Sequence, residues 1–177
     1  MAAEHALHFV EPGPPPPVPL LEPSATLCRG PRFFDERQHR TLEALCNRVL
    51  PQPSSRQAVP LAALLDARCF AGLDTADAEL GTPRDCWRTA LAAIEAEAQA
   101  RHGRSFSDLR GGEQDALLGA MRQGQLNHAA WQGLSCQRFF AVRLLRDIST
   151  AYYSHPAAWP SSGLIGSFAF TAQPRQE

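Results

Sequence analysis

The chain has 177 residues, 44% of them hydrophobic, which is enough to bury one sizeable core but hardly two. Its formal net charge of −1 gives no overall field that would attract nucleic acid or an anionic membrane surface. No apolar run approaches the roughly 20 residues that a membrane-spanning helix needs, so no membrane span is expected.

Residues 1–31 form a low-complexity leader that contains the string EPGPPPPVP. A proline run favours the polyproline II conformation and cannot build a helix or a central strand. We therefore expect an extended or disordered arm that acts as a spacer or lies over a partner. The leader has neither the features of a secretory signal nor a twin arginine, so the sequence as written predicts a cytoplasmic protein.

The first helical pattern follows the aromatic pair at 33–34. Asp35 and Gln38 have the spacing of a capping box, and an apolar stripe leads from Leu42 to Pro51, where the helix should end. A polar loop comes next, and a short helix is expected over 59–71.

A third helix should start at Thr82 and Pro83, a favourable cap and first residue, and end at Gly103. Its composition is that of a solvated helix, so Glu95 and Glu97 are expected to face water. A buried aromatic step then leads into a helix of about a dozen residues that ends near position 124.

The longest helical pattern runs from Trp131 to about His155 and stops at Pro156. At about 100° per residue, one apolar arc is expected to face the core. The residues on this arc are Leu134, Phe140, Ala141, Leu144, Leu145, Ile148, Ala151 and Tyr152. The other half holds Arg138, Phe139, Val142, Arg143, Arg146, Asp147 and Tyr153.

The mixture of arginines and aromatics on that second half has two explanations. Arg143 and Asp147 are spaced four apart, as in an ion pair on a helix surface. Phe139 and Tyr153, however, are unexpected among surface charges. The helix is therefore either buried on two sides or offers its second face to another protein.

No stretch alternates with a period of two residues long enough to predict a sheet, although 164–170 has the character of a short edge strand. The sequence predicts an all-α fold, a single irregular bundle of about five helices. We expect the helical domain to cover 32–160, with the proline-rich arm before it at 1–31 and a non-helical tail after it at 161–177.

Two strings in the chain carry a family resemblance. The string FFAVRLLRDISTAYYSHPAAW, at 139–159, resembles the C-terminal signature of the gluconate 2-dehydrogenase subunit 3 family. FFDERQHRTLEALCNRVLPQ, at 33–52, resembles the opening helix of the same family, and a Phe-x-x-Leu step at 106–109 also fits. The resemblance covers 33–160.

The resemblance implies a non-catalytic small subunit that binds, stabilises and assists maturation of a flavin-dependent dehydrogenase. The partner would be of the glucose–methanol–choline type and would act on a sugar, gluconate or another alcohol. FAD is then expected in the partner and not in this chain, and a cytochrome c subunit is a further candidate partner. Many family members export the partner on their own twin-arginine signal. Here a periplasmic complex would need the partner's signal or an earlier start codon.

The residues themselves give no catalytic, cofactor-binding or metal-binding motif. GxGxxG, GxSxG, the P-loop, HExxH and CxxCH are all missing. The cysteines at 28, 46, 69, 86 and 136 lack metal-ligand spacing, and most are expected to be buried hydrophobes, with one disulfide or a reactive thiol as the alternative.

What remains is recognition surface, because aromatic residues and arginine dominate interface hot spots. The predicted interface residues are Phe139, Arg143, Tyr153, Trp159, Phe168 and Phe170. Two other functions stay open on sequence alone. One is a free-standing helical binding module with an apolar groove, and the other is an enzyme that uses a cysteine nucleophile.

Overall fold

The computed structural model describes residues 33–52, 58–72 and 76–159, in which all regular structure is helical apart from one isolated bridge between Asp77 and Gly81. The prediction of an all-α fold with about five helices is confirmed. The predicted arm and tail, with Phe168 and Phe170, lie outside the described residues, as does the suggested edge strand. The elements are α1 (Glu36–Val49), α2 (Leu61–Ala71), α3 (Pro83–His102), η2 (Phe106–Asp108), α4 (Gly111–Arg122), η3 (Ala129–Trp131), α5 (Cys136–Arg138), η4 (Phe139–Leu144), α6 (Leu145–Tyr153) and η5 (Pro156–Ala158).

The predicted helix starts follow from local capping. The Asp35 side chain accepts a hydrogen bond from the backbone N–H of Gln38 (2.7 Å), and the Gln38 side chain accepts one from the N–H of Asp35 (3.2 Å). Thr82 caps α3 by accepting from the N–H of Asp85 at 3.2 Å. Gly103 ends α3 with a φ of 66°, a conformation that glycine adopts without strain.

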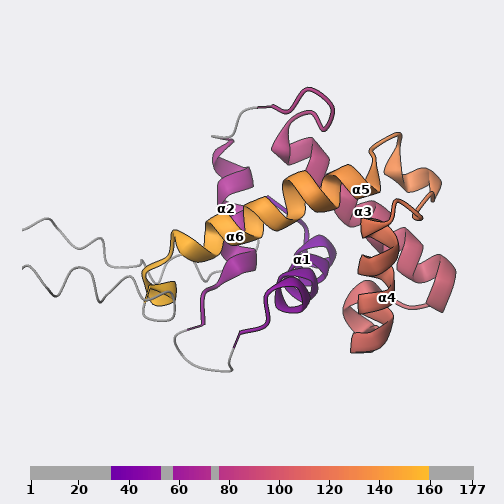
Figure 1. Ribbon diagram of the computed structural model, residues 1–177, viewed down its shortest axis with the longest axis horizontal. Coiled ribbons are helices and arrows are strands. Elements are labelled where there is room, and N and C mark those ends of the chain that lie inside the picture. The colour runs from indigo at the N-terminus through magenta and orange to yellow at the C-terminus, as the bar shows by residue number, and fades with distance from the viewer. Residues whose placement is uncertain (1–32, 53–57, 73–75, 160–177) are drawn as a thin grey trace, which may run out of the picture.

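The segments α5, η4 and α6 run on as one continuous helix, hereafter the long helix, from Cys136 to Tyr153 (Figure 1). Its middle part, η4, is π-helical. The predicted start at Trp131 is wrong by one turn, because Gln132 and Gly133 adopt left-handed conformations that no α-helix contains. Ser135 then caps the long helix.

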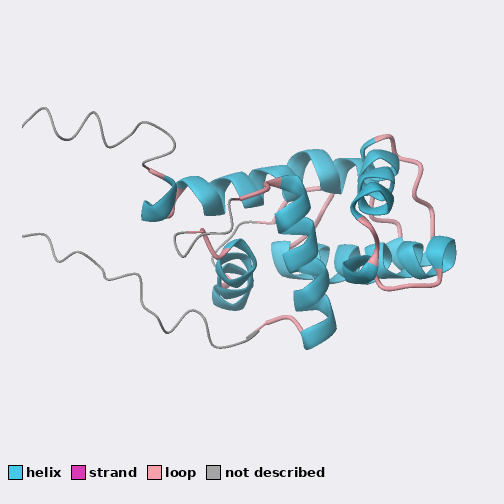
Figure 2. Ribbon diagram, turned by 90° about the horizontal axis from the view of Figure 1, so that it is seen from below, coloured by secondary structure: helices cyan, strands magenta, loops and turns pink. Residues whose placement is uncertain are grey.

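The long helix lies along one side of the molecule, and the other helices pack beneath it (Figures 1 and 2). It crosses α2 and contacts α3, while α1 packs against both α2 and α3. The buried faces of these helices meet in one core. Its largest fully buried apolar residues are Trp87, Phe106, Phe139, Leu42, Leu45, Leu65, Leu91, Ile94, Leu117, Met121 and Leu144. No helix of the described part is long and apolar enough to cross a membrane.

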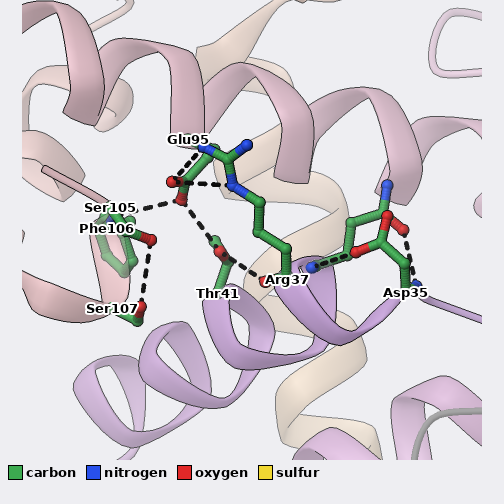
Figure 3. A network of polar contacts seen from close by, with 8 residues as sticks. Asp35, Arg37, Thr41, Glu95, Ser105, Phe106 and Ser107 are labelled. Carbon is green, nitrogen blue, oxygen red and sulfur yellow. Dashed lines mark hydrogen bonds and ion pairs between the residues drawn. The ribbon is translucent and has the colours of Figure 1, made fainter.

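A buried carboxylate, Glu95, joins α3 to α1 and to η2 (Figure 3). It accepts hydrogen bonds from the guanidinium of Arg37 (2.9 and 3.3 Å), the hydroxyl of Thr41 (3.2 Å) and the backbone N–H of Phe106 (3.2 Å). Pairing and hydrogen bonding of this kind offset the cost of burying a charge. The expectation that Glu95 faces water is wrong.

Glu97 is the second correction on α3, because only 4% of this residue is exposed. It accepts from the backbone N–H of His128 at 2.9 Å and from the indole N–H of Trp131 at 3.4 Å, and it pairs with Arg101. The loop before the long helix is thereby fixed to α3. Asp66 on α2 acts in the same way and accepts from two consecutive backbone N–H groups at 33–34.

The inward face of the long helix is not the predicted one. Phe139 is fully buried, whereas Leu145 is 38% exposed, and the buried row is Phe139, Arg143, Asp147 and Ala151. The prediction assumed that charges face water, but the charges of this row are paired inside. A four-residue step rotates an α-helix by about 40°, and the wider i→i+5 turn of η4 keeps the first two residues of the row closer to one face. Leu144, Ile148 and Ala151 do lie in the core as predicted.

This orientation of the long helix predicts a large loss of stability at one of its apolar residues and a small loss at another. Phe139→Ala should lower the free energy of unfolding by about 3–5 kcal/mol, because it leaves a cavity in the core. Leu145→Ala should cost about 1 kcal/mol or less, because much of its side chain already meets water. Urea unfolding of the two variants measures both effects. A larger loss for Leu145→Ala than for Phe139→Ala would show that Leu145, and not Phe139, faces the core.

The Glu95 network predicts a pH dependence. Burial raises the pKa of Glu95, but hydrogen bonds from Arg37, Ser105 and Phe106 outweigh it and hold the pKa below its ordinary value of 4.5. A carboxyl group with a lowered pKa stabilises the fold above its ordinary pKa, and this stabilisation is lost as the pH falls. The wild-type chain should therefore lose stability more steeply than Glu95→Gln between about pH 5 and pH 3.

Urea unfolding midpoints measured from pH 7 to pH 3 check this difference. Glu43→Gln, an exposed change on α1, is the matched control and should follow the wild-type curve. Parallel curves for Glu95→Gln and the wild type would mean that the carboxylate contributes no pH-dependent stability.

Candidate partner interface

A buried charge cluster sets the inner side of the long helix. The carboxylate of Asp147 accepts a hydrogen bond from the indole N–H of Trp87 on α3 (2.9 Å), and its second oxygen lies 3.4 Å from Nε of Arg146. The guanidinium of Arg143, 1% exposed, lies 4.0 Å from the same carboxylate. The pair expected on the helix surface is therefore in the core.

The fit of Arg143 is incomplete. Its Nε and Nη1 atoms are buried and make no hydrogen bond within the described structure. The Arg143 side chain lies beside the thiol of Cys86. Burial raises the pKa of that thiol, the Arg143 charge lowers it by less, and the resulting pKa is about 11. A buried arginine with so few partners depends on the Asp147 charge to stay in the core.

Aromatic packing completes this inner side. The ring of Phe139 meets the ring of Trp87 edge-on with the centroids 5.2 Å apart, and the Trp131 ring lies at 6.3 Å. Contacts of this kind stabilise a core beyond the area they bury. The prediction that Phe139 and Arg143 face outward for a partner is therefore wrong.

The end of the long helix shows which parts of the AYYSHPAAW string serve the fold. His155 accepts from the N–H of Ala157 at 3.2 Å and so caps η5, in which Pro156 is the first residue and Ala158 is fully buried. These residues fold the chain back at the helix end. The indole N–H of Trp159 donates to the carbonyl oxygen of Tyr153 at 3.3 Å.

Two aromatics of the string are left at the surface. Tyr153 is 59% exposed and Trp159 is 39% exposed. Both belong to the predicted interface residues, and both are available to a partner. Their part in binding remains a prediction.

The outer side of the long helix continues from these aromatics. We call its exposed residues the outer strip: Ala141, Leu145, Arg146, Ser149, Thr150 and Tyr153. Four of them repeat every four residues, and Leu145 and Tyr153 are about 12 Å apart along the axis. Arg146 is the one charged residue of the strip.

A comparison with α1 shows that this outer strip is poor in charge. The exposed residues of α1 are Glu36, Arg37, Arg40, Glu43, Asn47 and Arg48, so that five of the six are charged. The long helix exposes seven residues, the six of the outer strip and Gln137, and among them only Arg146 is charged. Depletion of charge together with exposed aromatics is typical of the centre of a protein–protein interface.

Sequence reasoning missed this strip because it assigned Ala141 and Leu145 to the core. A detectable signal was present: Ala141, Leu145, Ser149 and Tyr153 form an uncharged row at four-residue spacing. A second signal was the spacing of Arg143 and Asp147, which suits a buried pair as well as a surface pair. Choosing between the two needed the position of Trp87.

The structure also bears on the cysteine chemistry that the sequence left open. Cys46, Cys69, Cys86 and Cys136 are all buried. Burial, helped by the charge of Glu43, raises the pKa of Cys46 to about 12. A thiol with such a pKa stays protonated at neutral pH and is a poor nucleophile. Among the described residues, no three or more His, Cys, Asp or Glu side chains are grouped to hold a metal ion.

One groove matches the idea of a helical binding module. It runs between α1 and α3, has a volume of about 340 Å³ and is lined in part by Leu91, Ala92 and Ala96. Arg37 and Glu95 form its polar wall, and both are already paired with each other. Its polar lining also includes Asp35, Gln38, Thr41 and Gln99, and its one cation, Arg37, is already paired with Glu95.

Comparison with known proteins gives one match. Residues 36–164 match the family described as Gluconate 2-dehydrogenase subunit 3. The search of curated proteins found no match. The search of solved structures found none either.

The buried charge cluster predicts that the stability of the fold, with Arg143 in the core, depends on the Asp147 charge. Asp147→Asn keeps the acceptor for Trp87 but removes the carboxylate that lies 4.0 Å from the buried Arg143 guanidinium, so the free energy of unfolding should fall by about 3–5 kcal/mol. The double variant Arg143→Met with Asp147→Asn removes both charges and should recover most of the loss.

Chemical unfolding of the two variants and of Arg138→Met tests this coupling. Arg138 pairs with Glu79 near the surface, and its loss should cost about 1 kcal/mol or less. If the double variant were as unstable as Asp147→Asn alone, the Asp147 carboxylate would not stabilise the fold by compensating the buried Arg143 charge.

Proposed function

Because the chain belongs to the gluconate 2-dehydrogenase subunit 3 family, we propose that it is a non-catalytic subunit of a flavin-dependent dehydrogenase complex. In this role it binds the catalytic subunit, stabilises it and assists its maturation. The partner is a dehydrogenase of the glucose–methanol–choline type that oxidises gluconate, a sugar or another alcohol. FAD belongs to that partner, and a cytochrome c subunit is a further candidate component.

The observation that carries this proposal is the outer strip, which has a single charge, together with the exposed aromatics Tyr153 and Trp159 at the end of the long helix. Tyr153 and Trp159 have large, rigid side chains, which lose little entropy when a partner covers them. The Trp159 indole is held by its hydrogen bond to the backbone carbonyl of Tyr153, and the Tyr153 ring packs edge-on against the Tyr152 ring with the centroids 5.2 Å apart, so both are ordered before binding. A preformed apolar surface on a small subunit supports a binding role.

The remaining observations support a non-catalytic role over a cysteine-dependent enzyme. The raised pKa values of Cys46 and Cys86 disfavour thiolate chemistry at neutral pH. The buried carboxylates are Asp66, Glu95, Glu97 and Asp147, and each accepts hydrogen bonds that hold the fold together. These carboxylates serve to join the packed elements of the fold.

Co-expression of the chain with the flavin-dependent catalytic subunit of the same genome tests the proposal. The two should elute together in size-exclusion chromatography, and omission of the chain should lower the yield of soluble, FAD-loaded dehydrogenase. The chain purified alone should carry no flavin and show no dehydrogenase activity with gluconate or glucose. Stoichiometric flavin on the isolated chain, or a full yield of active partner without it, would refute the proposal.

Variants of the exposed aromatics sharpen this test. Tyr153→Ala and Trp159→Ala should each weaken the complex by about 2 kcal/mol, since exposed aromatic anchors contribute this much. The melting temperature of the isolated chain should change little. Phe70→Ala is the matched control, because Phe70 is a 56% exposed aromatic on α2 outside the outer strip. Equal affinities for all three variants would exclude the aromatics as anchors.

A further inference from the structure

The one charge of the outer strip is only partly neutralised within the chain. The side chain of Arg146 is 55% exposed and makes a single polar contact among the described residues, from Nε to Asp147 at 3.4 Å. The Asp147 carboxylate also serves Trp87 and the fully buried Arg143. Two guanidinium groups thus share one carboxylate, and the outer one retains most of its hydrogen-bonding capacity.

The surroundings of Arg146 limit what can cover the strip. Its neighbours on the strip are apolar, small or hydroxyl-bearing residues, so a partner must be largely uncharged where it meets them. A second copy of the chain fits poorly, because a two-fold axis through the strip would bring two Arg146 side chains together without a carboxylate between them. A membrane surface also fits poorly, because helices that bind one carry many basic residues beside the apolar face.

We propose that the outer strip docks on a largely apolar surface of the catalytic subunit, and that this surface presents one carboxylate, its single charge, to Arg146. This inference rests on the proposed function and names the chemistry of the partner's surface. The carboxylate pairs with the terminal nitrogens of the guanidinium, which fit a carboxylate in two parallel hydrogen bonds. The apolar contacts around this pair exclude water and strengthen it, while the pair fixes the register of the two surfaces.

Charges placed at the centre of the strip test the apolar part. Ser149 is small and exposed, so Ser149→Glu and Ser149→Lys should leave the isolated chain folded. Each should weaken binding to the purified catalytic subunit at least about tenfold, because a charge of either sign would be buried without a partner. The matched controls are Ala116→Glu and Ala116→Lys on the exposed side of α4, and they should bind within about twofold of the wild type.

Variants of Arg146 test the carboxylate. Arg146→Gln should weaken binding about tenfold and flatten the salt dependence of the affinity, because the ion pair is then lost. Arg146→Lys should bind with intermediate affinity, since one ammonium cannot make both hydrogen bonds. Isothermal titration calorimetry at two or more salt concentrations gives these values, and thermal melts of each free variant confirm that it is folded.

The outcomes separate this inference from the proposed function. If the wild-type chain does not bind the catalytic subunit at all, the proposed function fails. If the wild type binds and both Ser149 variants bind equally well, the function stands and the docking strip is overturned. If the Ser149 variants lose binding while Arg146→Gln keeps both its affinity and its salt dependence, the partner carboxylate is overturned.

Discussion

The hydrogen bond between the indole of Trp87 and the carboxylate of Asp147 determines how the long helix sits on the rest of the molecule. An ionised carboxylate in the core costs several kcal/mol unless it is paired and hydrogen-bonded. The long helix must therefore turn Asp147 towards α3, where the indole N–H lies 2.9 Å away. Once that rotation is fixed, Phe139 packs on the Trp87 ring, Arg143 enters the core, and the uncharged residues of the outer strip remain on the outside.

Buried carboxylates act in the same way elsewhere in the fold. Asp66 holds the chain entering α1, Glu95 holds α1 and η2, and Glu97 holds the loop before the long helix. In each case the acceptor receives backbone N–H groups that have no helical partner of their own. Short helices joined by irregular loops gain definition from such contacts, because loops would otherwise bury unpaired polar groups.

Local signals in the sequence were enough to predict the helices and most of their ends. The capping box at Asp35, the start at Thr82 and the end at Gly103 depend on residues within one turn, and all three are present. The burial of the carboxylates was not predictable in this way. Trp87 and Asp147 are 60 positions apart and Arg37 and Glu95 are 58 apart, so neither partner shows in a helical periodicity. Of the predicted interface residues, Tyr153 and Trp159 are exposed as anticipated, whereas Phe139 and Arg143 face the core because the helix is turned differently from the prediction.

One side of the long helix is buried in the subunit, and we propose that the catalytic partner buries the opposite side. Maleimide labelling of single cysteines measures this directly, in a background with Cys28→Ser to remove the thiol outside the described residues. We predict that Ser149→Cys reacts rapidly in the free chain and slowly in the complex, while Ala151→Cys on the inner side reacts slowly in both. Rapid labelling of Ser149→Cys in the complex, or of Ala151→Cys in the free chain, would contradict the account.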